Sequence, residues 1–296
     1  MRVFVTGATG FIGSTIVTEL LGAGHQVLGL ARSEEGARLL SATGAQVHRG
    51  EMEDLEGLRR AAALADGVIH AAFNHDFSKF AQNCEADRRA IEAIGGVLEG
   101  TDKPLIVTAG IHPTPGRPTT EDDLPPPGPG ATPRVSEQTA AVLAARGVHA
   151  SVLRLPQVHD RDRQGLVTYL IALAREKGVS AYVGAGLNRY PAIHLRDVAP
   201  LYRLALEKGA AGARYHAVAE EGVPVRQIAE AIGRGLKIPV VSLSPEETAA
   251  HFGWLGMFAG MDAIATSALT QQRLGWHPTQ QPGLIADLDQ ASAFAA

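Results

Sequence analysis

The sequence is poor in cysteine and has no long apolar run. Cys84 is the single cysteine among 296 residues, so the chain can build neither an internal disulfide nor a cysteine-based zinc site. A reducing compartment suits such a chain, and we expect a cytoplasmic protein in which Cys84 is a packed thiol. No segment reaches the roughly 18 consecutive apolar residues that a membrane-spanning helix needs, which argues against a membrane partner.

An excess of positive charge is also missing. Lys and Arg number 27 against 31 Asp and Glu, for a net charge of −4 at pH 7, and no basic cluster is present that could neutralise the phosphates of a nucleic acid. DNA and RNA are therefore disfavoured, and we expect a small-molecule substrate. The chain contains neither H-E-x-x-H nor G-x-S-x-G, so it offers no signature of a zinc peptidase or a serine hydrolase, and we predict no metal site.

Aromatic residues make up only 5% of the chain, and the tyrosines are unevenly placed. All five lie beyond residue 168: Tyr169, Tyr182, Tyr190, Tyr202 and Tyr215. The first half of the chain therefore has no phenol hydroxyl to offer to a reaction.

The first half of the sequence alternates short β-branched runs with segments of helical pattern, which is typical of a parallel sheet with helices on both faces. The expected strands are residues 2–6, 26–31, 46–49, 67–72, 104–108 and 150–155, and the expected helices are 12–21, 34–41, 54–64, 77–98 and 134–146. We predict an α/β fold with a doubly wound parallel Rossmann-type sheet over residues 1–160, into which the chain crosses back later.

The regular alternation loosens after residue 155. Helices are expected at 166–177, 197–208 and 225–236 and a strand at 180–183. We predict that residues 161–296 mostly form a smaller mixed C-terminal substrate lobe, which binds its ligand in a cleft against the core.

One proline-rich segment interrupts the first half. Residues 111–133 hold eight of the 17 prolines together with Glu121, Asp122 and Asp123, and so many prolines exclude regular helix or sheet. The segment is either a solvated excursion or an active-site loop, because it leaves the C-terminal end of a central strand, where open α/β sheets bind ligands.

The strongest motif is T-G-A-T-G-F-I-G at residues 6–13, which follows the first expected strand and opens the first helix. Gly7 permits a tight turn, Gly10 lets the backbone approach a pyrophosphate, and Gly13 allows the helix and strand to pack closely. The helix N-terminus supplies N–H groups for the phosphates, and in this context the motif predicts dinucleotide binding. The predicted cofactor loop comprises Gly7, Thr9, Gly10, Phe11, Ile12 and Gly13.

The end of the second expected strand indicates which dinucleotide is bound. An acidic residue there favours the ribose hydroxyls of NAD, whereas a basic residue pairs with the 2′-phosphate of NADP. The chain reads Ala31, Arg32 and Ser33 at this point. The planar fork of Arg32 and the hydroxyl of Ser33 therefore favour NADP(H), although Glu34 follows directly.

These residues together resemble the short-chain dehydrogenase/reductase superfamily, in its atypical or extended branch of NAD(P)-dependent epimerase/dehydratase-like proteins. Further segments carry the resemblance: GEMED at 50–54, VIHAA at 68–72, RLPQV at 154–158, the region 184–197 and LGWHP at 274–278. The resemblance implies a homodimer formed through the helices near 77–98 and 134–146. It also implies further cofactor contacts at Glu51, Met52, Ala71, Ala72, Phe73, Thr108, Pro156 and Val158.

The chain departs from the family pattern at the catalytic residues. The family has Ser or Thr after the fifth strand and a Tyr-x-x-x-Lys pair at the start of the next helix, whose Tyr moves the proton. Here the fifth strand ends in Thr108, Ala109 and Gly110, and neither Tyr nor Lys occurs over residues 129–137. The pair is missing.

Other groups must therefore assist hydride transfer, because a developing alkoxide needs a proton donor or a hydrogen-bonding electrophile. Arg134 is a candidate cofactor anchor in place of the lysine, and also a candidate donor. Each candidate histidine can equally be structural. The candidate catalytic residues are Thr108, His112, Ser136 and Tyr190, and the candidate substrate contacts are His75, Ile111, His112, His159, Tyr190 and Trp254.

The sequence thus predicts an NADP-dependent oxidoreductase with a non-standard proton donor, which reduces a small or medium apolar carbonyl, imine or similar substrate. Two alternatives stay open. One is a non-catalytic NADP-binding regulator or sensor, and the other is an epimerase or isomerase that uses the nicotinamide transiently.

Overall fold

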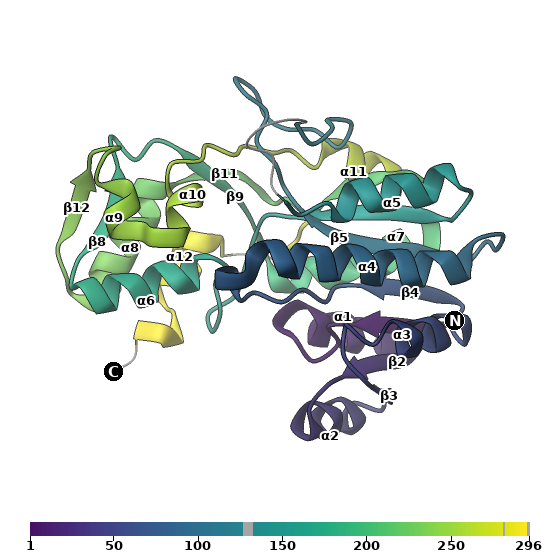
Figure 1. Ribbon diagram of the computed structural model, residues 1–296. Helices are drawn as coiled ribbons and strands as arrows, with labels where there is room; N and C mark the ends of the chain where they lie inside the picture. The colour runs from purple at the N-terminus through teal and green to yellow at the C-terminus, as the bar shows by residue number, and fades with distance from the viewer. Residues whose placement is uncertain (127–132, 281, 295–296) are drawn as a thin grey trace.

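A seven-stranded parallel sheet forms the core of the computed structural model, which describes residues 1–126, 133–280 and 282–294 (Figure 1). The strand order is β10-β6-β5-β4-β1-β2-β3, and every neighbouring pair is parallel. The strands are β1 (Arg2–Thr6), β2 (Gln26–Ala31), β3 (Gln46–Arg49), β4 (Gly67–His70), β5 (Leu105–Gly110), β6 (Ala150–Leu155) and β10 (Arg214–His216). The winding direction reverses between β1 and β4, so a ligand crevice is expected at the carboxyl ends of these two strands.

The predicted α/β sheet is confirmed, with one strand shorter than expected. The strand β4 ends at His70 rather than at Ala72, because the N–H groups of Ala71 and Ala72 turn away from the ladder and donate to Thr6 Oγ1, each at 3.2 Å. The strand end and the start of the glycine loop are thereby tied together.

Helices cover both faces of this sheet. One face carries α3 (Leu55–Ala63), α4 (Phe80–Leu98) and α5 (Ser136–Ala145), and α4 and α5 cross the front of the sheet in Figure 1. The opposite face carries α1 (Phe11–Gly22) and α7 (Leu195–Lys208), which pack on each other, and α2 (Glu34–Ala42) packs beside β2 and β3. Since α7 and β10 belong to the core, the chain crosses back into it after residue 160.

The helix α7 begins two residues earlier than expected. His194 Nδ1 accepts a hydrogen bond from the N–H of Arg196 at 3.1 Å and so caps the helix. Asp197 lies in the first turn and is used differently, since its carboxylate accepts hydrogen bonds from the backbone N–H groups of Thr279 and Gln280.

Most of the remaining elements gather at one end of the molecule, on the left in Figure 1, as a smaller mixed lobe, whereas α11 (Ala268–Leu274) and η1 (Phe77–Lys79) lie beside the core. One sheet has the order β11-β9-β7, and β12 pairs with β8 in a second. The strands are β7 (Gln157–His159), β8 (Ser180–Val183), β9 (Arg189–His194), β11 (Glu220–Pro224) and β12 (Val240–Leu243). The helices of the lobe are α6 (Val167–Lys177), α8 (Val225–Leu236), α9 (Thr248–Phe252), α10 (Gly256–Ala259) and α12 (Leu284–Asp289). The helix α11 lies beside β10. The short 3₁₀ turns are η1, which precedes α4, η2 (Gly253–Leu255) and η3 (Ser292–Phe294).

The proline-rich segment is anchored to the C-terminal part of the chain. The N–H of Thr119 donates to the carbonyl of Ile264 at 2.8 Å, and Glu121, which is fully buried, accepts hydrogen bonds from the N–H and the hydroxyl of Thr270, each at 2.6 Å. Its described part is therefore not simply a solvated excursion, while residues 127–132 of the predicted loop lie outside the described residues.

Two further features bear on function. Among the residues that the structure describes, no helix combines the length and the apolar character needed to cross a bilayer. Cys84 is buried, and burial raises the pKa of its thiol to about 11, so this thiol is held in its unreactive protonated form.

Candidate cofactor and reaction site

The glycine loop leaves no room for side chains at two of its three glycines. Gly7 has a φ of +69°, and a Cβ there would lie 2.8 Å from the backbone of Ala71 and Ala72. A Cβ on Gly13 would lie 1.9 Å from the carbonyl oxygen of Gly7, so only glycine lets α1 start this close to β1. Gly10 caps α1 without a side chain, and the start of this helix therefore suits a phosphate. The residues present fit a dinucleotide.

Two arginines lie at the corner where the 2′-phosphate is predicted. Arg32 is exposed at the end of β2, and Ser33 Oγ accepts the N–H of Gly36 at 3.0 Å and so caps α2. Arg49 was not among the predicted residues; its Nη1 donates to the carbonyl of Ser33 at 2.6 Å and its Nη2 pairs with Glu34 at 2.8 Å. Its place at the end of β3, next to the end of β2, was the signal that could have identified it.

The other predicted cofactor contacts follow the carboxyl ends of the core strands. Glu51 and the buried Met52 come after β3, Ala71, Ala72 and Phe73 after β4, and Pro156 and the buried Val158 after β6. Their roles stay predictions.

A chain of buried polar side chains joins the glycine loop to the start of α5. Thr6 Oγ1 contacts His70 Nδ1 at 3.0 Å, and His70 Nε2 contacts Asp87 Oδ1 at 3.1 Å. The hydroxyl of Ser136 donates to Asp87 Oδ2 at 2.5 Å, and Arg134 Nε donates to Ser136 Oγ at 3.0 Å. This series of hydrogen-bonded side chains ends in the Arg134 guanidinium at the carboxyl edge of the sheet.

Asp87 supplies the negative charge in this series of side chains. Burial by itself raises the pKa of its carboxyl, but the hydrogen bond from His70, the charge of Arg134 and the hydrogen bond from Ser136 lower the pKa below its usual value. An ionised Asp87 oxygen therefore faces each neighbour, and through Ser136 the carboxylate holds Arg134 in a fixed orientation.

Arg134 lies in the segment where the family has its tyrosine. Its Nη2 donates to the carbonyl of Thr108, at the carboxyl end of β5, at 3.2 Å. Its guanidinium lies 4.2 Å from the ring centroid of Phe73, which follows β4. A permanent positive charge is thereby placed beside the ends of β5 and β4, and β4 is one of the two strands that border the expected crevice.

Thr108 lies close to Arg134, but its hydroxyl is engaged elsewhere. Its Oγ1 donates to the carbonyl of His70 at 2.7 Å and lies 2.7 Å from the hydroxyl of Tyr202. Tyr202 comes from α7, on the opposite face of the sheet from α5, and burial raises the pKa of its hydroxyl far above the usual value. No sequence signal pointed to Tyr202, because it lies 94 residues from Thr108.

The structure brings together only some of the predicted catalytic residues. Thr108 and Ser136 lie in one network with Arg134, whereas Tyr190 donates its hydroxyl to the carbonyl of Phe258 at 2.8 Å inside the smaller lobe. Ile111 follows β5 and is half-buried.

Two histidines that were predicted as site residues lie outside the network of Arg134. His159 is buried, and its Nδ1 lies 2.8 Å from Asp287 Oδ2. His112 has both ring nitrogens buried without a hydrogen-bond partner in the described part of the chain, and burial, together with the charge of Arg154, lowers its pKa.

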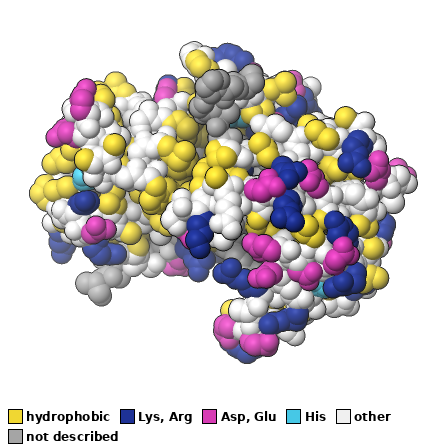
Figure 2. Space-filling view, viewed as in Figure 1, with side chains coloured by type: hydrophobic (Ala, Val, Ile, Leu, Met, Phe, Trp, Pro, Cys, Tyr) yellow, Lys and Arg dark blue, Asp and Glu magenta, His cyan; other side chains and the backbone are white. Residues whose placement is uncertain are grey.

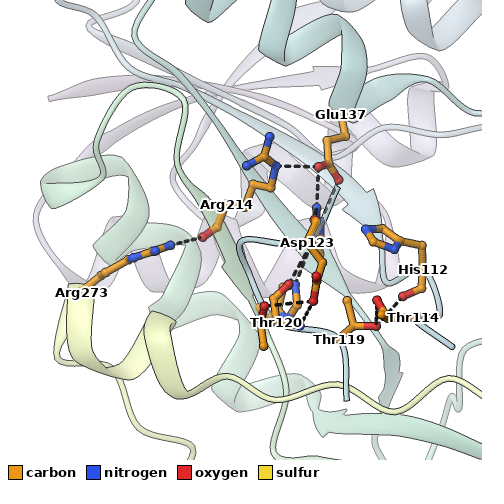
Figure 3. A network of polar contacts seen from close by, with 10 residues as sticks. His112, Thr114, Thr119, Thr120, Asp123, Glu137, Arg214 and Arg273 are labelled. Carbon is orange, nitrogen blue, oxygen red and sulfur yellow. Dashed lines mark hydrogen bonds and ion pairs between the residues drawn. The ribbon is translucent and has the colours of Figure 1, made fainter. Parts of the chain in front are cut away.

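A second polar network fixes the proline-rich segment against α5 (Figure 3). Glu137 accepts two hydrogen bonds from Arg154, at 2.8 and 2.5 Å, and one from Arg214 at 2.7 Å. Arg154, which is fully buried, also donates to the carbonyl of Asp123 at 2.6 Å. One carboxylate thus holds β6, β10 and the proline-rich segment to the first turn of α5.

His216 completes this network and gives it a pH dependence. The ring is fully buried, its Nε2 lies 3.0 Å from Arg154 Nη1, and its Nδ1 lies 2.8 Å from the carbonyl of Thr266. Because Arg154 can only donate, Nε2 is the acceptor and the proton is on Nδ1. Burial, reinforced by the Arg154 charge and opposed by the Thr266 hydrogen bond, lowers the pKa of His216 to about 4.

Acid is therefore expected to destabilise the protein through His216. Between pH 6.5 and pH 4 the histidine binds a proton in the unfolded chain but stays neutral in the folded protein, because its pKa is near 6.5 unfolded and about 4 folded. The free energy of unfolding is therefore highest above pH 6.5 and falls as the pH is lowered toward 4. The loss is about 3 kcal/mol at pH 4. Urea unfolding at pH 7, 5 and 4 measures it, and His216→Gln, which keeps an acceptor for Arg154, should show a flatter dependence. Equal slopes for the two proteins would exclude His216 as the cause.

His75 and Trp254, two of the predicted substrate contacts, meet in a cluster of aromatic rings. The ring of His75 lies 5.3 Å from that of Phe73 and 6.1 Å from that of Phe77, and Phe77 stacks on Trp254 at 4.1 Å. Partial desolvation, and then the charge of Arg134, lower the pKa of His75.

A doubly wound sheet with a glycine loop at its switch point defines the class of Rossmann-type dinucleotide-binding proteins. Residues 3–219 match the model of the NAD dependent epimerase/dehydratase family. The chain belongs to this family, which confirms the resemblance to the extended short-chain dehydrogenase/reductase superfamily.

Known proteins are similar over nearly the whole chain. A Schizosaccharomyces pombe protein, the uncharacterized protein C2A9.02, is 51% identical over 299 residues, which cover 99% of this chain and 100% of that one. The 4-hydroxy-2-methyl-3-oxo-4-farnesyl-3,4-dihydroquinoline-1-oxide ketoreductase of Stigmatella aurantiaca is 27% identical over 277 residues, covering 86% of this chain and 80% of that one. The structure of the Thermus thermophilus UDP-glucose 4-epimerase in complex with NAD shares the fold, with a TM-score of 0.75 at 21% identity over 100% of this chain and 99% of that one.

Proposed function

We propose that the protein is an NADP-dependent reductase of small or medium apolar carbonyl or imine substrates, in which the Arg134 guanidinium takes the place of the missing tyrosine hydroxyl. One observation carries the proposal. Arg134 is fixed by Ser136 and by the carbonyl of Thr108 at the carboxyl edge of the sheet, and it lies over Phe73, which follows β4 at the border of the cofactor crevice. We also propose that the smaller lobe binds the substrate, and that the protein acts in the cytoplasm as a homodimer.

The cofactor preference rests on the corner formed by β2 and β3. Arg32 and Arg49 offer two guanidinium groups near the predicted position of the 2′-phosphate, and a planar guanidinium binds phosphate oxygens in pairs. Glu34, which follows Ser33 directly, is paired with Arg49 at 2.8 Å. This arrangement favours NADPH over NADH.

The glycine loop and Arg32 would hold NADPH, which when bound would supply the hydride for the carbonyl carbon, so that the carbonyl oxygen takes the π electrons and the negative charge. Arg134 stabilises the resulting alkoxide by charge and by hydrogen bonding. Arginine keeps its own proton near neutral pH, and the hydroxyls of Thr108 and Ser136 are engaged in the interior, so the alkoxide takes its proton from solvent. Asp87 does not touch the substrate; it positions Arg134 through Ser136.

A named relative that resembles this chain over most of its length supports a reductase. The Stigmatella aurantiaca protein is a ketoreductase by name, and its substrate name describes a farnesyl-bearing, largely apolar ketone. Polar sugar substrates are less favoured by the aromatic surroundings of Arg134.

The test is the loss of 340 nm absorbance when the protein is mixed with NADPH and a panel of apolar aldehydes, ketones and imines. We expect turnover with NADPH at least about tenfold more efficient than with NADH, and we expect Arg32→Ala to remove this preference by weakening NADPH alone, since a lost charge-assisted hydrogen bond costs about 1.5–3 kcal/mol. Leu64→Ala, an exposed change on the core, serves as a control.

Other outcomes would favour the alternatives. Tight NADPH binding without turnover of any compound would indicate a regulator or sensor. Formation of an isomer with no net oxidation of NADPH would indicate an epimerase. Equal use of NADH and NADPH would contradict the proposed preference for NADPH but not the proposed reductase function.

A further inference from the structure

A track of aromatic rings leads from Arg134 to the surface between the two lobes. Phe73 lies under the Arg134 guanidinium, and the ring centroids along the track are 6.2 Å apart for Phe73 and Phe80, 5.6 Å for Phe80 and Phe77, and 4.1 Å for Phe77 and Trp254. Each step is an ordinary contact between aromatic rings. The aromatic track, as used below, comprises Phe73, Phe80, Phe77, Trp254 and Tyr169.

The track is built from both parts of the molecule. Phe73 and Phe77 come from the segment after β4, whereas Tyr169 is on α6 and Trp254 on η2 of the smaller lobe. The rings of Phe77 and Trp254 stack almost in parallel, at 10°. Figure 2 shows hydrophobic side chains gathered in the middle of this face, where the smaller lobe meets the core.

This concentration of rings is unusual for the chain and is not a buried core. The whole chain has eight Phe, two Trp and five Tyr. The track contains three of the Phe, one Trp and one Tyr. Trp254 is 40% exposed and Tyr169 is 37% exposed, so solvent reaches the outer end. At the inner end the Arg134 guanidinium lies over Phe73, and both residues are half-buried. An apolar wall with one cation at its inner end fits a ligand that is flat and apolar along most of its length and carries an oxygen at one end.

We propose that the substrates of this site are aldehydes and ketones whose carbonyl is attached to a flat aromatic ring system, with the rings held along the aromatic track and the oxygen directed to Arg134. This inference rests on the proposed reductase function and names its substrate class. Phe77 and Trp254 determine the specificity. Because their rings are in contact at 4.1 Å, a flat ligand either stacks on an open ring face or separates the pair.

Binding of a product alcohol, measured by isothermal titration calorimetry with NADP⁺ present, tests the inference without requiring turnover. The probes are 2-naphthylmethanol and cyclohexylmethanol, and the variants are Trp254→Ala, Trp254→Phe and Phe77→Ala. Met257→Ala is the matched control, because Met257 is 56% exposed on α10 of the same lobe and has no place in the track. Thermal unfolding of each variant confirms that it is folded.

The wild type is expected to bind the naphthyl alcohol at least about tenfold more tightly than the cyclohexyl alcohol. Both alanine variants should lose about tenfold in affinity for the naphthyl alcohol alone, since stacking adds to the burial of apolar area. Trp254→Phe should retain most of the affinity, and Met257→Ala should match the wild type.

Two results separate this inference from the proposed function. If the binding pattern is as expected but 2-naphthaldehyde is not reduced by NADPH, the aromatic site stands and the reductase function is wrong. If aldehydes are reduced but the wild type does not distinguish the two alcohols, or the ring variants bind as the wild type does, the reductase function stands and the aromatic substrate class is overturned.

Discussion

Replacing Arg134 by glutamine is expected to lower kcat for carbonyl reduction by about 10² to 10³-fold, because a donor aimed at a developing alkoxide contributes on this scale. Glutamine keeps a hydrogen-bonding amide but loses the charge. The Kd for NADPH should change by much less, since the proposed contact forms mainly in the transition state. Steady-state rates and fluorescence titration of NADPH measure the two quantities separately.

The matched control is Arg146→Gln at the other end of α5, where Arg146 forms a surface ion pair with Glu99. This change should leave kcat within about twofold, because exposed pairs contribute little. Arg134→Lys should recover part of the rate by restoring the charge without the planar fork. A large rise in the Kd for NADPH with an unchanged kcat would instead assign Arg134 to cofactor anchoring and contradict its role at the alkoxide.

Replacing Glu137 by alanine is expected to lower the free energy of unfolding by about 3–5 kcal/mol, the usual cost of leaving a buried partner charge uncompensated. Arg154 is fully buried and donates two hydrogen bonds to this carboxylate, and Arg214 donates a third. The proline-rich segment should loosen as well, because Arg154 also holds the carbonyl of Asp123. Urea unfolding measures the first effect, and limited proteolysis within residues 111–126 measures the second.

An exposed ion pair provides the comparison for this change. Glu35 pairs with Arg38 on the surface of α2, and Glu35→Ala should alter stability by less than about 1 kcal/mol. If Glu137→Ala were as mild as Glu35→Ala, the network around Arg154 would contribute little to holding the proline-rich segment, and its anchoring would have to come from Thr119 and Glu121.

Several structural features could be predicted because their causes are local in the sequence. The bounds of β1, β2, β3 and β6 follow from short β-branched runs between turn residues. The glycine loop could be predicted because the positive φ of Gly7 and the close approach at Gly13 need glycine at fixed spacing. The missing tyrosine could also be identified from the sequence, because the residue types over a short segment can be read without a structure.

The proposed role of Arg134 in place of the tyrosine could not be found in this way. Arg134 was expected mainly as a cofactor anchor, and nothing near it in the sequence shows that Asp87 orients it through Ser136, because 49 residues separate Asp87 from Ser136. Glu137 likewise resembles an ordinary residue of a first helical turn, whereas Arg154 and Arg214 reach it from β6 and β10.

The sequence by itself determined the Rossmann core, the dinucleotide loop, the basic corner after β2 and the lack of Tyr and Lys over residues 129–137. Each depends on residues within a few positions of one another, where backbone geometry and side-chain type act directly. Only the tertiary structure decided which groups surround the reacting edge. Burial joins side chains from distant strands and helices there, and an ionised or hydrogen-bonding group is tolerated in the interior only with a partner of matching chemistry, which the fold rather than the local sequence supplies.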